Sequence, residues 1–186
     1  VESECARPER RSEVLKAFEA RDGSPMLAHG LGRSYGDAAL IRDGKVIMTR
    51  RLDRMLAFDK TTGWLRCEAG VSLKEIVDTF LPRGWFPPVV PGTQFVTVGG
   101  AIGCNIHGKN HHVDGSFGDH VRRLEVLTGR GEIVFCDRDN EPELFWATVG
   151  GMGMTGVILS LELQLVPVPN AFIEMETVRV NNLAEF

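Results

Sequence analysis

The chain has 186 residues, of which 43% are hydrophobic and 25% are charged. This composition is typical of one globular domain with room for the start of a second, and it excludes a disordered or collagen-like chain. The 21 Lys and Arg residues and 25 Asp and Glu residues give a formal net charge of −4, which argues against a nucleic-acid partner. Glycine is enriched at 21 residues, so many backbone positions are expected to need a positive φ or a close approach.

The cysteines form no CxxC pair, and no signal-like apolar segment precedes them, so we expect reduced thiols and a cytoplasmic protein. These cysteines are Cys5, Cys67, Cys104 and Cys136. Residues 84–108 carry no Asp, Glu, Lys or Arg, but their prolines and glycines favour loops over a transmembrane helix. Because the chain begins at Val1 and ends at Phe186, within a new alternating segment, we interpret it as part of a longer protein.

The N-terminal residues predict a small α/β unit. Residues 12–20 place apolar side chains on one face of a helix, with Ser12 as its cap. Short apolar runs at 25–28 and 45–48 predict strands, and a glycine-rich loop lies between them.

The next elements are a hairpin and a capped helix. Residues 54–58 and 64–68 predict two antiparallel strands around a turn. Ser72 and Glu75 have the spacing of a capping box, which predicts a helix from there to about Leu81.

Residues 84–118 predict a long irregular segment, with eight glycines, three prolines and three histidines. An irregular stretch of this length within a compact domain is usually functional. Beyond it, 120–128 and 131–136 predict paired strands, and 141–149 predict a short helix. Residues 157–166 alternate cleanly, which indicates a half-buried antiparallel strand.

Two glycine patterns match nucleotide-binding strings without the context that those strings require. The pattern Gly151-x-Gly153-x-x-Gly156 lies between a predicted helix and a following strand, whereas a dinucleotide-binding loop needs the helix after it. Residues 103–110 resemble a P-loop, but Asn110 stands where a Ser or Thr must bind magnesium, and no helical period follows.

A third pattern fits an anion-binding loop better. Residues 28–37, AHGLGRSYGD, directly follow the first predicted strand. Their glycines can bring main-chain N–H groups close to a phosphate, while Arg33, Ser34 and Tyr35 add charge and hydroxyl donors. A simple surface turn is the alternative.

The histidines raise the alternative of a zinc-binding interaction module. The candidate ligands are Cys104, His107, His111, His112 and His120. The i, i+4 spacing of His107 and His111 makes a site only on a helix, and the flanking Gly108 and Gly115 argue against one. Structural or substrate-facing histidines are therefore favoured.

Taken in chain order, these residues resemble the FAD-binding domain of the vanillyl-alcohol-oxidase superfamily, also called the PCMH type. Within it they resemble the family of decaprenylphosphoryl-ribose oxidases and related FAD-linked sugar oxidases. The matching strings are GLGRSYGD at 30–37, PGT at 91–93, VTVGGAI at 96–102, IHGKNHH at 106–112, GSFG at 115–118 and ELFWATVGG at 143–151.

The resemblance implies an FAD whose pyrophosphate lies in the first loop and whose flavin and ribityl chain follow the second glycine segment, with Val157 near the adenine. The implied cofactor-binding residues are Ala28, His29, Gly30, Leu31, Gly32, Arg33, Ser34, Tyr35, Gly36, Asp37, Ala38, Gly92, Thr97, Val98, Gly99, Gly100, Cys104, Asn105, Ile106, His107 and Val157. Related oxidases that attach flavin covalently have a histidine where this chain has Arg33, so we expect noncovalent FAD, with attachment through Cys104 as an alternative.

The resemblance also implies the reaction, which is flavin-dependent oxidation of a CH–OH group of a sugar or polyol, such as a decaprenylphosphoryl-ribose-like substrate. His107 and Lys109 would face the substrate as the candidate catalytic residues. A reductase similar to the one acting on UDP-N-acetylenolpyruvylglucosamine, or an FAD-carrying subunit, is the alternative of the same fold. The expected partners are a small-molecule sugar or polyol substrate, the missing C-terminal substrate domain, and an electron-accepting or reductase protein.

We therefore expect an α+β fold, a two-lobed FAD-binding domain over residues 1–170. Residues 1–81 would form a small α/β lobe, and residues 82–169 a mostly antiparallel sheet with helices. Residues 171–186 would begin a truncated C-terminal substrate domain, and no segment is expected to cross a membrane.

Overall fold

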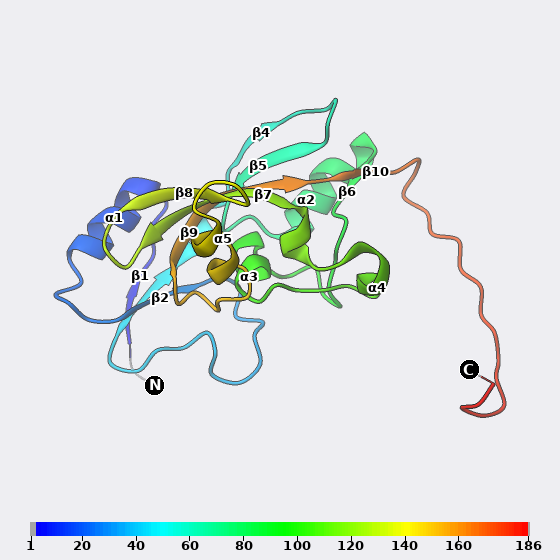
Figure 1. Ribbon diagram of the computed structural model, residues 1–186, viewed down its shortest axis with the longest axis horizontal. Helices are drawn as coiled ribbons and strands as arrows, with labels where there is room; N and C mark the ends of the chain where they lie inside the picture. The colour runs from blue at the N-terminus through cyan, green and yellow to red at the C-terminus, as the bar shows by residue number, and fades with distance from the viewer. Residues whose placement is uncertain (1–2, 186) are drawn as a thin grey trace.

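The computed structural model describes residues 3–185 and shows the predicted α+β architecture, with two main sheets (Figure 1). The smaller sheet is parallel and has the order β1-β3-β2. Its strands are β1 (Glu4–Ala6), β2 (Met26–His29) and β3 (Lys45–Met48). The predicted strands at 25–28 and 45–48 are thus confirmed to within a residue.

The larger sheet is antiparallel and has the order β4-β5-β9-β7-β8. Its strands are β4 (Met55–Phe58), β5 (Trp64–Glu68), β7 (Val121–Thr128), β8 (Ile133–Asp137) and β9 (Gly156–Gln164). A short pair, β6 (Trp85–Phe86) and β10 (Val166–Pro167), lies beside it. Because β4 and β5 pair with this sheet, the change from one sheet to the other falls after Met48, well before the boundary expected near residue 81.

Two helices have the predicted positions, but only one of them has the predicted cap. In α1 (Arg11–Glu19) the N-cap is Arg10, and Ser12, predicted as the cap, lies inside the helix. No side chain caps the first turn; the Glu13 carboxylate accepts the main-chain N–H of Glu9, which precedes the N-cap, at 2.7 Å. In α2 (Leu73–Phe80) the predicted capping box of Ser72 and Glu75 is present.

The stretch expected to be irregular contains two short helices, α3 (Val98–Gly103) and α4 (His111–Asp114). Thr97 caps α3, because its hydroxyl accepts the N–H of Gly100 at 3.2 Å. The expectation that no helix follows residue 110 was wrong by the single turn of α4. The helix α5 (Pro142–Thr148) then precedes β9, as predicted.

Strand β9 lies at the centre of the larger sheet and is buried on both faces, not half-buried as expected. Leu161 and Leu163 join the core beneath α2 and α3, whereas Val157 and Leu159 join a second core with α1 and β3. Ser160 is only 7% exposed, and its hydroxyl is satisfied by donating to the buried carboxylate of Glu125 at 2.7 Å. The two cores therefore meet at one strand.

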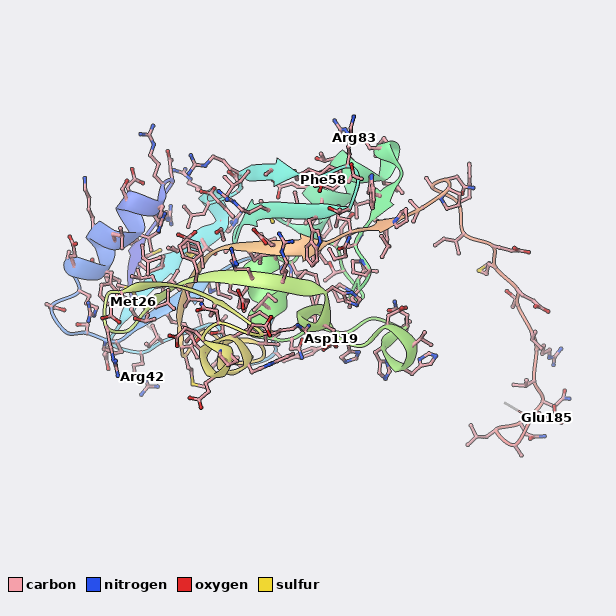
Figure 2. The ribbon with its side chains drawn as sticks, turned by 45° about the horizontal axis from the view of Figure 1, so that its top comes forward. Met26, Arg42, Phe58, Arg83, Asp119 and Glu185 are labelled. Atoms are coloured by element: carbon pink, nitrogen blue, oxygen red, sulfur yellow. The ribbon has the colours of Figure 1, made fainter. Side chains whose placement is uncertain are left out.

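Residues 171–185 carry no helix or strand and are exposed, and Figure 2 shows Glu185 at the far end of this segment, away from the body. Within residues 3–185, none of the helices is long and apolar enough to cross a bilayer.

Candidate functional site

The first glycine loop, residues 30–41, follows β2 and presents its main chain outward. Figure 1 shows it as an extended coil below α3. Gly32 and Gly36 have φ of +62° and +57°, which only glycine adopts readily, and the Tyr35 side chain is 98% exposed. Among the described residues, no acceptor takes the main-chain N–H groups of residues 31–39. The loop therefore holds a run of free donors, which is what an anion requires.

The start of this loop packs closely on the start of α3. A Cβ on Gly30 would lie 2.3 Å from the hydroxyl oxygen of Thr97, a side chain that is 2% exposed. Gly99 packs in the same way, because a Cβ there would lie 2.9 Å from the Cβ of Ala69. Gly30 thus allows the loop to lie against Thr97, and Gly99 allows α3 to lie against Ala69.

The tip of the loop meets the end of α3. The hydroxyl of Ser34 lies 3.5 Å from the sulfur of Cys104, which is exposed. The structure therefore brings together two of the segments that the sequence implicated in cofactor binding, the loop 28–38 and the segment 97–107.

The segment after α3 is held by a neighbouring turn of 3₁₀ helix, Phe117–His120. The side-chain oxygen of Asn105, which has φ of +40°, accepts the N–H of Gly118 at 3.0 Å. The N–H of Phe117 donates to the carbonyl of Ile106 at 2.8 Å, and His107 forms an isolated β-bridge with Ser116. These contacts fix the main chain of residues 105–107.

His107 and Lys109 are both exposed on this side of the domain. The His107 ring lies 5.1 Å from that of His111, measured between centroids, and no described hydrogen bond occupies its nitrogens. Gly92 also faces open space, since a Cβ there would have no neighbour within 4 Å. The candidate catalytic side chains are thus accessible from solvent.

Two implied cofactor residues have side chains that face away from this surface. Val98 is fully buried, and Val157 is 5% exposed and packs in the core with Val14 and Phe18. The main-chain N–H of Val98 already donates to the carbonyl of Val71 at 2.8 Å, and Val157 is paired with Leu127 of β7.

Sequence reasoning missed two supports of the site. Thr49 donates its hydroxyl to the carbonyl of His29 at 3.2 Å. The N–H groups of Gly150 and Met152 donate to the carbonyls of Ile102 and Gly103, at 2.9 and 2.8 Å, and so hold the last turn of α3. The glycine pattern at 151–156 was a usable signal for this second support, whereas nothing near Thr49 in the sequence marks its role.

The histidine cluster does not gather into a metal site. In the part of the chain that the structure describes, no group of three or more His, Cys, Asp or Glu residues could hold a metal ion. The ring nitrogen Nε2 of His120 lies 2.8 Å from the carbonyl of Asp114 instead.

Comparison with known proteins identifies relatives that share this domain. The family described as the FAD binding domain matches residues 4–137. Decaprenylphosphoryl-beta-D-ribose oxidase of Mycolicibacterium smegmatis is 49% identical over 160 residues, covering 86% of this chain and 35% of the relative. Cytokinin dehydrogenase 3 of Arabidopsis thaliana is 29% identical over 160 residues, covering 84% and 30%, respectively. The chain spans about a third of the length of these relatives.

The residues present fit FAD. The loop 30–41 offers free N–H donors for a pyrophosphate. Gly30 lies so close to Thr97, at the start of α3, that a side chain at residue 30 would not fit. With the family match covering well over half of the chain, these observations lead to one conclusion: the chain belongs to the FAD binding domain family, as an α+β domain of the PCMH type whose cofactor is FAD.

Proposed function

We propose that this domain is part of a flavin-dependent oxidoreductase that oxidises a CH–OH group of a sugar or polyol, with a decaprenylphosphoryl-ribose-like substrate. The observation that carries this proposal is the 49% identity, over 86% of the chain, to an enzyme named for its action on decaprenylphosphoryl-beta-D-ribose. L-gulonolactone oxidase of Scyliorhinus torazame, at 29% identity over 140 residues, supports the broader substrate class.

In this proposal the cofactor binds without a covalent bond. The free N–H groups of the loop would hold the pyrophosphate, and the segment 97–107 would lie along the ribityl chain and the flavin. Arg33 stands before Ser34 and has no imidazole through which a flavin could be attached. When bound, FAD supplies an acceptor for the hydride that leaves the alcohol carbon.

The chain's own contribution to chemistry comes from His107 and Lys109. The free ring nitrogens of His107 make it the candidate acceptor for the proton of the substrate hydroxyl. The exposed ammonium of Lys109, two residues away, would orient the polar end of the substrate. The bridge between His107 and Ser116 holds this segment in place for both roles.

The rest of the protein is proposed to provide the substrate pocket. Two thirds of each relative's length lies outside the part matched by this chain. We place the substrate domain there, beginning near residue 171, together with the surface that contacts the electron acceptor.

The first experiment is a visible absorption spectrum of the full-length protein, recorded before and after acid precipitation. Flavin bands that remain with the native protein and pass into the supernatant on denaturation support noncovalent FAD. Flavin that stays with the pellet contradicts it and makes Cys104 the first residue to test as the site of attachment.

Turnover is then measured with decaprenylphosphoryl-ribose and with simple polyols. We expect His107→Gln and Lys109→Met to lower kcat/KM at least about tenfold while flavin remains bound. The exposed His112, whose replacement His112→Gln should leave turnover unchanged, is the matched control. Full activity of the His107 variant, with an unchanged pH profile, excludes its role as the proton acceptor.

A further inference from the structure

The neck of the first glycine loop is closed by a single side chain. His29 is the last residue of β2, and its ring nitrogen Nδ1 lies 2.9 Å from the carbonyl oxygen of Ala39. The loop thus leaves the sheet at residue 30 and returns to the same imidazole at residue 39. Because a carbonyl can only accept, Nδ1 must carry the proton in this contact.

The same ring also contacts the first turn of the loop. A Cβ on Gly32 would lie 3.1 Å from Nε2 of His29 and 3.3 Å from its Cε1. Gly32 therefore needs to be glycine both for its positive φ and because the imidazole lies against it. Thr49 holds the main chain of His29 in turn, through the hydrogen bond to its carbonyl.

The loop has little else to maintain its shape. Residues 35–38 are exposed. In the described part of the chain, Leu40 is the only one of residues 31–40 whose main-chain N–H donates to a carbonyl, that of Asp37. Ordering such a segment costs about 1–2 kcal/mol of backbone entropy per residue. A hydrogen bond that closes the neck lowers this cost before any ligand arrives.

We propose that His29 is a positioning residue for FAD: its Nδ1–H donates to Ala39 and keeps the loop closed around the run of free N–H donors. The proposal rests on the placement of the pyrophosphate in this loop. His29 acts through the loop and need not touch the cofactor, and its contribution is the shape of the loop in the free protein.

Isosteric variants of the full-length protein separate the hydrogen bond from simple packing. The amide nitrogen of Asn lies where Nδ1 of histidine lies, whereas the amide nitrogen of Gln lies near Nε2. We expect His29→Asn to bind FAD within about twofold of the wild type. His29→Gln and His29→Ala are expected to bind about two- to tenfold more weakly, because a neutral hydrogen bond contributes roughly 0.5–1.5 kcal/mol. The affinity is measured by titrating apoprotein with FAD and following the quenching of flavin fluorescence.

Hydrogen exchange of the apoprotein provides a second readout that does not depend on FAD. The amides of residues 30–40 should exchange faster in the Ala and Gln variants and at the wild-type rate in the Asn variant. The matched control is His112→Ala, at an exposed histidine outside the loop, which should change neither quantity. Far-UV circular dichroism confirms that each variant is folded.

Two results overturn the proposal. If Gln preserves FAD affinity and Asn loses it, ring volume rather than the Nδ1 donor maintains the loop. If exchange rises in the Ala variant while FAD affinity stays at the wild-type value, the loop does not hold the pyrophosphate. In that case the proposed site fails, although FAD remains the cofactor of the domain.

Discussion

At the scale of single residues, burial divides the cysteines into two kinds. Cys67 is fully buried, and the loss of solvation raises the pKa of its thiol to about 12. Burial likewise raises the pKa of Cys136 to about 11. Cys5 and Cys104 are exposed. Because the thiolate is the nucleophile, the two kinds should differ in reactivity even though all four thiols are free.

We therefore expect iodoacetamide at about pH 8 to modify Cys5 and Cys104 in the native protein and to spare Cys67 and Cys136. The proposed site adds a second expectation: saturating FAD should slow the modification of Cys104 and leave that of Cys5 unchanged. Mass spectrometry of tryptic peptides measures both rates. Rapid alkylation of Cys67 without unfolding contradicts the complete burial of this side chain in β5.

At the scale of elements, local interactions were readable from the sequence and long-range ones were not. The strand β5 and the capping box of α2 depend on neighbouring residues, so patterns predicted them well. Helix α3 contains three glycines and has no helical period; it forms because Thr97 caps it and Gly99 packs on Ala69. The strings of the site could be recognised, but the contact of His29 with Ala39 could not, because loop closure has no local pattern.

Arg138 follows β8 and connects the larger sheet to the 3₁₀ turn Phe117–His120, beside α3. Its Nη2 donates to the carbonyls of Gly118 and Asp119, at 3.2 and 2.9 Å, and its guanidinium lies 5.0 Å from the centroid of Trp146. Asp119 is labelled in Figure 2, on the connection next to β7. Since Gly118 binds Asn105, Arg138 supports the proposed flavin-side segment indirectly.

Replacing Arg138 with Ala should therefore lower the free energy of unfolding by about 1–2 kcal/mol and speed hydrogen exchange at residues 105–107. Arg122→Ala is the control, because Arg122 also lies over a tryptophan, Trp64 at 4.5 Å, and pairs with Glu162 on the outer face of the sheet. It should cost less than about 1 kcal/mol and leave exchange at 105–107 unchanged. Equal effects of the two variants on that segment contradict the connection.

At the scale of the whole molecule, carboxylates that accept hydrogen bonds tie stability to pH. The Thr62 hydroxyl and the Thr61 N–H lower the pKa of Asp59 in the β4–β5 turn below its usual 3.8. The main-chain N–H groups of Asn140 and Asp139 do the same for Asp137 after β8. A lowered pKa in the folded state stabilises the protein above pH 3.8, and this stabilisation is lost as the pH falls through the folded-state value.

The free energy of unfolding should therefore fall between about pH 5 and about pH 3, and Asp59→Asn and Asp137→Asn should each reduce that dependence. Both variants are expected to be less stable than the wild type at the higher pH and to approach it at the lower one. Urea titrations at the two pH values test this. If the free energy of unfolding depends on pH as steeply in a variant carrying both substitutions as in the wild type, these carboxylates are not the source of the dependence.

The central position of β9 has a consequence for how the protein is made. This strand is the last of the larger sheet to leave the ribosome, yet it pairs with both β5 and β7. Until it emerges, the nascent chain holds two separate hairpins with bare edges, and neither core can close. Folding during synthesis must therefore wait until most of the domain has been translated, and chains released before Gly156 would be substrates for chaperones or proteases rather than smaller working domains.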